Sequence, residues 1–402
     1  MGALLITGGR VVDPVASLDA VCDLRIRNGI VVEIGKQLES DEGERAIDVT
    51  GAVVAPGFID MHVHLREPGF PQKETIATGT EAAVRGGFSA VACMPNTDPA
   101  LDSSATLRWL GENVRRSGRC RVYPIGAITI GRKGREPCDF AALAKAGAVG
   151  FSDDGDTVAD ASVLRDAALH ARHAPGVFIS HCDPEDFIVA RDLSIAGETG
   201  NLWHIAHLST RDALEIVRNA RAHGTQVTCE ATPHHLTFTA DDARRIGPAA
   251  RVNPPLRREE DVAALRQGVR DGTIDALASD HAPHTEAEKN DPAAPAPGFS
   301  GLEIAVGAYA DALPDLPVAR FVELLSANPA RILGIAGGTL RPGAVADVTI
   351  FAERSWIVDP STFASKGRST PFAGRRLPRM VLATIVGGEL RYSVPELGIP
   401  VA

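Results

Sequence analysis

The feature that most constrains this chain is the alternation of eight short apolar runs with amphipathic segments between about residues 57 and 335. The runs read GFIDMHVHL, FSAVACMP, RVYPIGAIT, AVGFSDDG, VFISHC, LWHIAHLS, QVTCEATP and IDALASDHAPH. Nearly continuous apolar runs are typical of parallel strands buried on both faces. Eight strand–helix units predict an α/β fold, a (β/α)8 barrel of the TIM type, which typically takes about 250 residues. The alternative is a doubly wound sheet, but no run is followed by GxGxxG or GxxxxGK(S/T).

The two ends of the chain differ from this middle part. Both carry short β-branched segments separated by glycine, such as LLITGGRVVDP near the start and RMVLATIVGGELRYS near the end, and we expect short antiparallel strands there. A few short strands bury little apolar surface alone. We therefore predict one small β-sandwich domain built from residues 1–56 and 336–402, beside a barrel of residues 57–335. The alternative is two separate flanking extensions.

Composition narrows the possible partners. The 51 acidic and 41 basic residues give a formal net charge of −10, which argues against a nucleic-acid binder. No apolar run is long enough to cross a membrane, and the first residues lack the basic segment of a signal peptide. The six cysteines form no CxxC pair, which predicts reduced thiols and a cytoplasmic location. A small molecule is the expected partner.

Histidines gather where the apolar runs end. Of the 12 histidines, only His170, His173 and His223 fall outside these ends. The active site of such a barrel lies at the carboxyl ends of its strands. Residues at i and i+2 on a strand share a face, so His62 and His64 can close on one metal ion. The alternative is polar residues that merely fill the barrel mouth, but His or Asp at four further strand ends favours a metal.

Nitrogen and carboxylate ligands without a thiolate pair suit zinc or another divalent ion. We expect His181 to be a ligand, and we prefer His207 to the deeper His204, which we expect to be structural. His234 and His235 are adjacent, so on a strand they would face opposite ways and would support the site rather than bind metal.

Three further residues suggest the chemistry. Asp280 is the catalytic candidate, because a carboxylate beside a metal keeps a low pKa, can bind that metal and can accept a proton. Arg66 and Asn96 are expected to hold substrate, since a guanidinium offers a bidentate fork to a carboxylate. For Arg66 the alternative is a salt bridge with Glu67 or Glu74.

A set of motifs resembles those of the dihydroorotases, in the type I branch of the amidohydrolase superfamily. The motifs span nearly the whole chain: MHVHLREPG, MPNTDP, FSDDG, ISHC, HIAHLST, TPHHL, NPPLR, ASDHAPHT and SKGRSTPFAG. The resemblance implies a zinc hydrolase, with one or two zinc ions and two favoured. Such an enzyme reversibly interconverts N-carbamoyl-L-aspartate and dihydroorotate, the third step of pyrimidine synthesis.

The resemblance also implies roles for individual residues. One zinc would be bound by His62 and His64 and the other by His181 and His207, with Asp280 as ligand and catalytic acid/base. Many relatives bridge the metals with a carboxylated lysine; here Asp154 of FSDDG would bridge, and Asp153 would bind neighbouring backbone. Substrate would be held by His64, Arg66, Asn96, Asn253, His284 and the backbone at Pro297 and Gly298.

Two segments need the structure to interpret them. Residues 182–206, between His181 and His207, are shorter than the equivalent connection in similar enzymes, which affects site enclosure, metal retention and subunit contacts. TEAEKNDPAAPAPG, after His284, would be either a mobile lid or a passive surface loop.

Other functions stay open. One is a hydantoinase or allantoinase, although these generally use the lysine bridge. Another is a non-catalytic dihydroorotase-like subunit of aspartate transcarbamoylase, which loss of the metal histidines would mark. A homodimer or an association with aspartate transcarbamoylase would be the protein partner.

Overall fold

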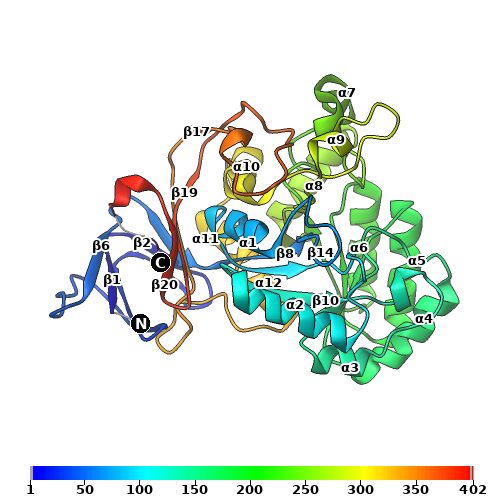
Figure 1. Cartoon of the computed structure of the whole chain (residues 1–402), viewed down its shortest axis with the longest axis horizontal. Helices are drawn as coiled ribbons and strands as arrows, with labels where there is room; N and C mark the ends of the chain where they lie inside the picture. Colours follow the sequence, from blue (N-terminus) through cyan, green and yellow to red (C-terminus); the bar gives the residue numbers. More distant parts are fainter. Residues whose placement is uncertain (1–2, 399–400, 402) are drawn as a thin grey trace.

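The computed structural model describes residues 3–398 and 401. Its centre is a sheet of eight parallel strands that follow one another in sequence order (Figure 1). The strands are β8 (Phe58–Val63), β9 (Phe88–Cys93), β10 (Arg121–Gly126), β11 (Gly150–Phe151), β12 (Val177–Ser180), β13 (Trp203–Ile205), β14 (Val227–Ala231) and β15 (Ala276–Leu277). A parallel bridge between Val63 and His281 joins the first strand to the end of the eighth. The predicted (β/α)8 barrel is thus confirmed.

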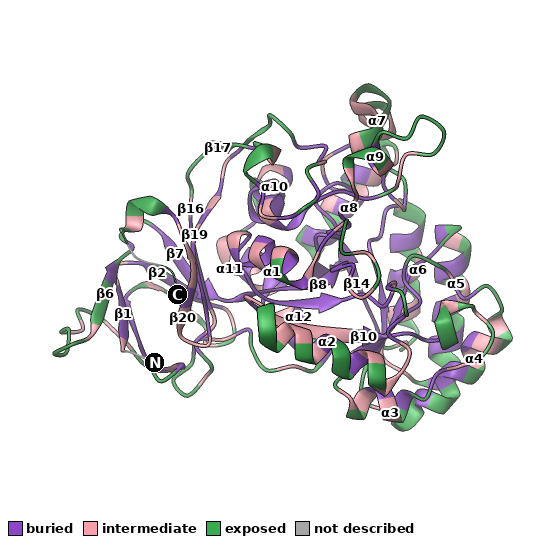
Figure 2. Cartoon of the chain, viewed as in Figure 1, coloured by how far each residue is buried: buried purple, intermediate pink, exposed green. Residues whose placement is uncertain are grey.

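Helices follow the barrel strands and cover the sheet. They are α1 (Ile76–Arg85), α2 (Ser104–Ser117), α3 (Phe140–Lys145), α4 (Ala161–His170), α5 (Glu185–Thr199), α6 (Arg211–Ala222), α7 (Ala240–Ile246), α8 (Glu259–Asp271), α9 (Glu286–Lys289), α10 (Ala305–Ala312), α11 (Val318–Leu325) and α12 (Ala327–Leu333). Local sequence explains them. In α2, for example, the side chain of Ser103 accepts the N–H of Thr106, and Leu107 and Leu110 are buried on the inner face. Figure 2 shows this pattern of buried inner and exposed outer faces.

The chain ends form two sheets that share a core. The first contains β1 (Leu4–Thr7), β4 (Asp23–Arg27), β5 (Ile30–Gly35) and β6 (Arg45–Asp48). The second contains β2 (Arg10–Asp13), β3 (Leu18–Val21), β7 (Val53–Pro56), β16 (Val348–Ala352), β19 (Met380–Val386) and β20 (Glu389–Ser393). Both sheets contribute to one apolar cluster, to which Ile6 and Val348 belong. Strands from both ends of the chain therefore build one β-sandwich.

Two details of these sheets differ from the expected antiparallel strands. β2 pairs with β7 in parallel, and so does β1 with β6. In both cases four strands lie between the partners in sequence, which gives the chain room to return in the same direction. The two chain ends themselves meet through β7 and β16, which are antiparallel.

Part of the C-terminal region leaves the sandwich and returns over the barrel, as Figure 1 shows in orange. This segment contains β17 (Trp356–Ile357) and β18 (Arg376–Leu377). Its residues Phe363 and Phe372 share an apolar cluster with Phe238 and Phe299 of the barrel. The hydroxyl of Ser365 donates to the buried carboxylate of Glu74. The C-terminal region is thus fastened to the barrel as well as to the sandwich.

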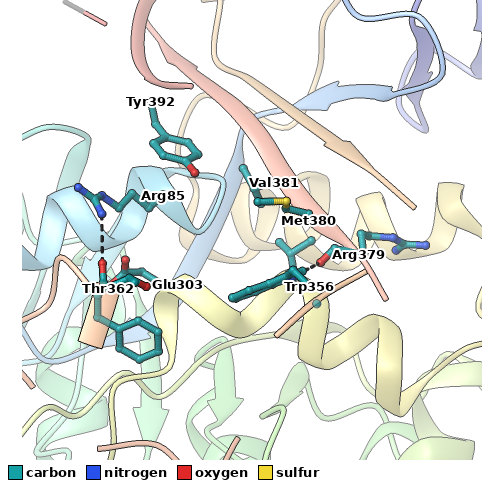
Figure 3. A pocket seen from close by; sticks show the side chains of 11 residues that line it. Arg85, Glu303, Trp356, Thr362, Arg379, Met380, Val381 and Tyr392 are labelled. Carbon is teal, nitrogen blue, oxygen red and sulfur yellow. Dashed lines mark hydrogen bonds between the residues drawn. The ribbon is translucent and has the colours of Figure 1, made fainter. Parts of the chain in front are cut away.

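A cavity of about 270 Å³ lies between the barrel and this region (Figure 3). Its charged side chains are already engaged in the fold. Arg85 pairs with Glu81 at 3.1 Å, and the carboxylate of Glu303 accepts the N–H of Ala364 at 2.9 Å. The guanidinium of Arg379 is paired with Glu353. The cavity is therefore best described as part of the contact between the two regions.

Among the described residues, no helix combines the length and the apolar character that crossing a membrane requires. All six cysteines are buried and none forms a disulfide.

Candidate metal centre and active site

The carboxyl ends of the barrel strands surround a pocket of about 170 Å³. All but one of the residues predicted to bind metal or substrate line it: His64, Arg66, Asn96, Asp154, His181, His207, Asn253, Asp280, His284, Pro297 and Gly298. The remaining one, His62, is fully buried beside Asp154 and Asp280. The structure therefore brings together every residue that the sequence singled out for the site.

Two groups of histidine and carboxylate side chains could each hold a metal ion. His62, His64 and Asp280 form one, and His62, Asp154 and His207 form the other. In the first, Asp280 Oδ1 lies 3.3 Å from His64 Nε2 and 3.7 Å from His62 Nε2. In the second, Asp154 Oδ1 lies 3.3 Å from His62 Nε2 and 3.6 Å from His207 Nε2. The groups share His62 and are therefore adjacent.

Asp154 lies between two pairs of histidines. Its Oδ1 is 3.5 Å from His181 Nδ1, which itself is 2.9 Å from His207 Nε2. Its Oδ2 is 3.5 Å from His64 Nε2. One carboxylate thus faces ligand candidates on both sides, which is the arrangement that a bridging ligand requires.

The neighbouring Asp153 turns away from the pocket. Its Oδ1 accepts the backbone N–H groups of Ile128 at 2.9 Å and Thr129 at 3.1 Å, and its Oδ2 accepts the Thr129 hydroxyl. This side chain is satisfied by the preceding strand–loop junction. Both of its carboxylate oxygens thus accept hydrogen bonds away from the histidine cluster.

The residues fit a metal because the site leaves ligand atoms unsatisfied. His62 Nε2 and Asp154 Oδ1 are buried and make no hydrogen bond, although each faces the other at 3.3 Å. A buried polar atom without a partner costs free energy. A cation between these atoms would supply the missing partner, and the nitrogen and carboxylate set suits a divalent ion.

Hydrogen bonds behind the histidines aim their free nitrogens at the centre. His62 Nδ1 lies 2.9 Å from Glu230 Oε1, and His64 Nδ1 lies 2.8 Å from Asn96 Oδ1. Both oxygens can accept a proton from Nδ1, so that a bound metal ion would find the lone pair of each Nε2 free. Asn96 therefore orients a ligand candidate, in addition to lining the pocket.

Sequence reasoning missed Glu230, at the end of β14. Its Oε2 lies 3.1 Å from His204 Nε2, and its Oε1 also accepts the backbone N–H of His207 at 3.2 Å. Burial alone would raise the pKa of Glu230, but hydrogen bonds from His204 and His62 lower it to about 2. The sequence feature that could have identified Glu230 is its position as an acidic residue inside a buried apolar run. His204 is occupied by Glu230 and Thr228, as expected of a structural residue.

The two candidate carboxylate ligands are ionised at neutral pH. Burial would raise the pKa of Asp280, but the hydrogen bond from His64 and the nearby His62 hold it well below its usual range. His62 and the other histidines likewise hold the pKa of Asp154 low against the effect of burial. Both groups are therefore anionic and able to bind a cation.

Three residues of the site have a backbone conformation that side chains rarely adopt. The φ angles are +64° at Arg66, +35° at His207 and +48° at Asp280. Non-glycine residues in this region are uncommon and occur preferentially where the surrounding structure imposes them, as at functional sites. The strand ends are thus shaped to turn these side chains into the pocket.

Arg66 is a buried cation without an acidic partner in the described part of the chain. Its Nε donates to the carbonyl of Pro283 at 3.1 Å, and its Nη2 lies 3.2 Å from His284 Nε2. The alternative of a salt bridge with Glu67 or Glu74 does not occur. Burial lowers the pKa of Arg66 to about 10, which still leaves it charged at neutral pH. It is therefore available to an anionic ligand.

Asn253, Pro297 and Gly298 form another part of the pocket lining. The side-chain amide of Asn253 lies 3.1 Å from His181 Nε2. The carbonyl of Pro297 lies 2.8 Å from His284 Nε2, and the N–H of Gly298 donates to Arg251. Gly298 has φ +119°, and a Cβ there would lie 2.6 Å from a backbone oxygen, so only glycine fits. The carbonyl of Pro297 and the N–H of Gly298 therefore already have partners within the protein.

The adjacent His234 and His235 do not face opposite ways, so this expectation was wrong. β14 ends at Ala231, and both residues lie in the following turn with ring centroids 4.3 Å apart. Strand alternation does not apply there. Both rings contact the Thr232 hydroxyl, and burial lowers the pKa of His234 to about 3.

The short connection after His181 leads directly into α5, which begins at Glu185. A groove of about 810 Å³ runs beside the pocket and shares Asn253 and Pro297 with it. Asp183, in the short connection, lies on its edge. Asn253 and Pro297 therefore line both the pocket and the groove.

Solved structures with similar folds include an L-hydantoinase from Arthrobacter aurescens, with a TM-score of 0.88 and 24% identity over 97% of this chain and 96% of that one. A D-hydantoinase structure also has a TM-score of 0.88, at 19% identity over 98% of this chain and 96% of that one. At such identities the similarity shows a common fold and no more.

Sequence comparison identifies the family. The family model described as dihydro-orotase-like matches residues 51–204. A dihydroorotase of Pelotomaculum thermopropionicum is 46% identical over 96% of this chain and 98% of that protein. Dihydroorotases of Pelobacter propionicus and Geobacter metallireducens are 41% and 40% identical over 97% of this chain and 99% of each protein. A chain with such relatives over nearly its whole length, and with this cluster at its strand ends, belongs to the dihydroorotase family.

Proposed function

We propose that this protein is a dihydroorotase. It would reversibly close N-carbamoyl-L-aspartate to (S)-dihydroorotate with loss of water, the third step of pyrimidine biosynthesis. The observation that carries the proposal is one pocket that combines the histidine and carboxylate cluster with the unpaired cation of Arg66. A cyclic amide that bears a carboxylate matches both features: the amide would face the metal cluster, and the carboxylate would face Arg66.

The metal is proposed to be zinc, with two ions per chain. His62 and His64 would hold one, His181 and His207 the other, Asp154 would bridge them, and Asp280 would complete the first site. A divalent ion held there polarises a carbonyl oxygen and lowers the pKa of a bound water to about 7.

Asp280 is the proposed acid/base. Its depressed pKa leaves the carboxylate free to accept a proton at neutral pH. In hydrolysis it would take a proton from the attacking water and deliver it to the ring nitrogen as the amide bond breaks. In ring closure it would take the proton from the carbamoyl nitrogen and return it to the departing water.

The side chains around Asp280 would orient the substrate. Arg66 would hold the substrate carboxylate through its guanidinium, with His284 beside it, and Asn96, Asn253, Pro297 and Gly298 would complete the lining. Holding the ring in one pose brings the reacting atoms together, which is a large part of the rate enhancement.

Replacement of Arg66 tests this function. Arg66→Met should raise KM for dihydroorotate by about 10- to 150-fold, because a charge-assisted contact contributes roughly 1.5–3 kcal/mol. Zinc content, measured on the same samples, should stay at the wild-type level. Equal rates of the wild type on dihydroorotate and on hydantoins that lack a carboxylate would contradict the proposal and favour a hydantoinase.

A non-catalytic subunit is disfavoured because all the candidate ligands are present and clustered. Association with aspartate transcarbamoylase or as a homodimer is proposed from the family resemblance, and light scattering with and without the transcarbamoylase would test it. The six unpaired cysteines support the cytoplasm as the proposed compartment.

A further inference from the structure

Lys289, the last residue of α9, is a buried lysine with an unusual set of partners. It is 2% exposed, and its Nζ donates to the carbonyls of Gly298 at 2.7 Å, Ala296 at 2.9 Å and Arg251 at 3.3 Å. No acidic side chain of the described residues pairs with it. An ammonium group has three protons, and here each has a carbonyl acceptor.

These three carbonyls belong to two segments that form one wall of the substrate pocket. Arg251 precedes Asn253 by two residues, and Ala296 and Gly298 flank Pro297. The Gly298 N–H also donates to the Arg251 carbonyl at 2.9 Å. The lysine and this backbone bond therefore join the segments just behind the atoms that face the pocket.

We propose that Lys289 is a positioning residue, which sets substrate affinity by holding residues 251–253 and 296–298 together as one wall. The proposal rests on the proposed dihydroorotase function. Without the ammonium, the carbonyls of Ala296 and Gly298 lose a donor, and that of Arg251 keeps only the N–H of Gly298. The loss of a donor to the buried Gly298 carbonyl is destabilising. The two segments would then separate, and Asn253 and Pro297 would lose their placement.

The same contacts bear on the segment after His284, where the sequence left a mobile lid or a passive loop open. Thr285 caps α9, and Lys289 fastens Ala296 and Gly298 at the other end of the segment. The exposed residues of this segment are Glu286, Ala287, 290–294 and Pro297. The segment is therefore held at both ends, with the exposed stretch 290–294 between them. Burial lowers the pKa of Lys289 to about 8, so the group remains mostly cationic at neutral pH.

The test compares Lys289→Met with the wild type and with Lys145→Met, an exposed lysine at the end of α3. Methionine keeps an unbranched chain and removes the donors. We expect KM for dihydroorotate to rise by about 10-fold or more, kcat to change by less than about threefold, and metal content to stay unchanged. Lys145→Met should match the wild type in all three quantities.

Chemical rescue separates positioning from a general loss of stability. In Lys289→Ala, added propylammonium should lower KM towards the wild-type value, whereas propanol should not. If Lys289→Met does not fold, Lys289→Arg decides. It keeps the charge, but its planar fork does not match three converging carbonyls, so KM should still rise with metal retained.

The outcomes distinguish the two proposals. A wild type that does not turn over dihydroorotate refutes the proposed function itself. An active wild type with an unchanged KM in the folded lysine variants overturns only the role of Lys289. A loss of metal in parallel with kcat would also overturn it, because Lys289 would then act on the metal centre rather than on the substrate wall.

Discussion

At the scale of single residues, the two adjacent aspartates of the fourth strand end have separate tasks. Asp154 faces histidines on both sides, whereas Asp153 is occupied by Ile128 and Thr129. Both aspartates follow β11, which ends at Phe151, so they lie in the loop after the strand rather than on it.

This division predicts opposite effects of substitution. Asp154→Ala should lower both zinc content and rate, because the carboxylate between the two histidine pairs is lost. Asp153→Ala should lower the free energy of unfolding by about 1–3 kcal/mol, because backbone donors lose their acceptor, while zinc is retained. Metal analysis and denaturant unfolding of both variants measure this. A zinc-bound crystal structure with Asp153 as the ligand and Asp154 outside would refute the assignment.

At the scale of elements, the first residue of α5 ties two strand ends together. The carboxylate of Glu185 is 5% exposed and accepts the N–H groups of Ser209 at 2.7 Å and Thr210 at 3.0 Å. These residues follow His207, and Arg257 contacts the same carboxylate at 3.3 Å. The short connection after His181 therefore places an acceptor directly on the loop that carries the next histidine.

We predict that Glu185→Ala weakens both this loop and the metal site beside it. The free energy of unfolding should fall by about 2–3 kcal/mol, because buried N–H donors lose a charged acceptor. Zinc should also dissociate more readily in equilibrium dialysis. The matched control is Glu198→Ala on the same helix, whose exposed pair with Arg165 should contribute less than about 1 kcal/mol. Equal effects of the two substitutions would argue against the role of Glu185.

At the scale of the whole molecule, Glu303 connects the barrel to the returning C-terminal segment. Its carboxylate accepts the N–H groups of Ala364 at 2.9 Å and Ser365 at 3.2 Å. Burial nevertheless raises the pKa of Glu303 to about 7. The group is thus poised to lose its proton near neutral pH, at the contact between the two regions.

This raised pKa predicts a pH-dependent stability. Between the ordinary glutamate pKa of about 4.3 and 7, the folded state keeps a proton that the unfolded state has lost, so stability falls as pH rises through this window. The Tm of the wild type relative to Glu303→Gln should therefore decrease between pH 5 and pH 8. Calorimetry of both proteins across this range is the measurement, and parallel curves would contradict the shift.

The sequence by itself determined the barrel and most of the site. The apolar runs and the amphipathic segments between them are local patterns, and the barrel places every strand end on one face, so His62, His64, His181, His207 and Asp280 could be predicted to meet. The orientation of His234 and His235 was predicted wrongly, because the alternation of side chains along a strand does not show at which residue the strand ends.

Only the tertiary structure decided which residues support that site. Glu230 lies 168 positions from His62, and Lys289 lies 38 positions from Arg251. Nothing in the neighbouring sequence marks either pair, because each contact exists only after the strands have closed into the barrel. The return of Ser365 to Glu74, 291 positions away, depends likewise on how the sandwich docks. Local patterns fix which elements form, whereas long-range packing fixes which buried polar groups must satisfy one another.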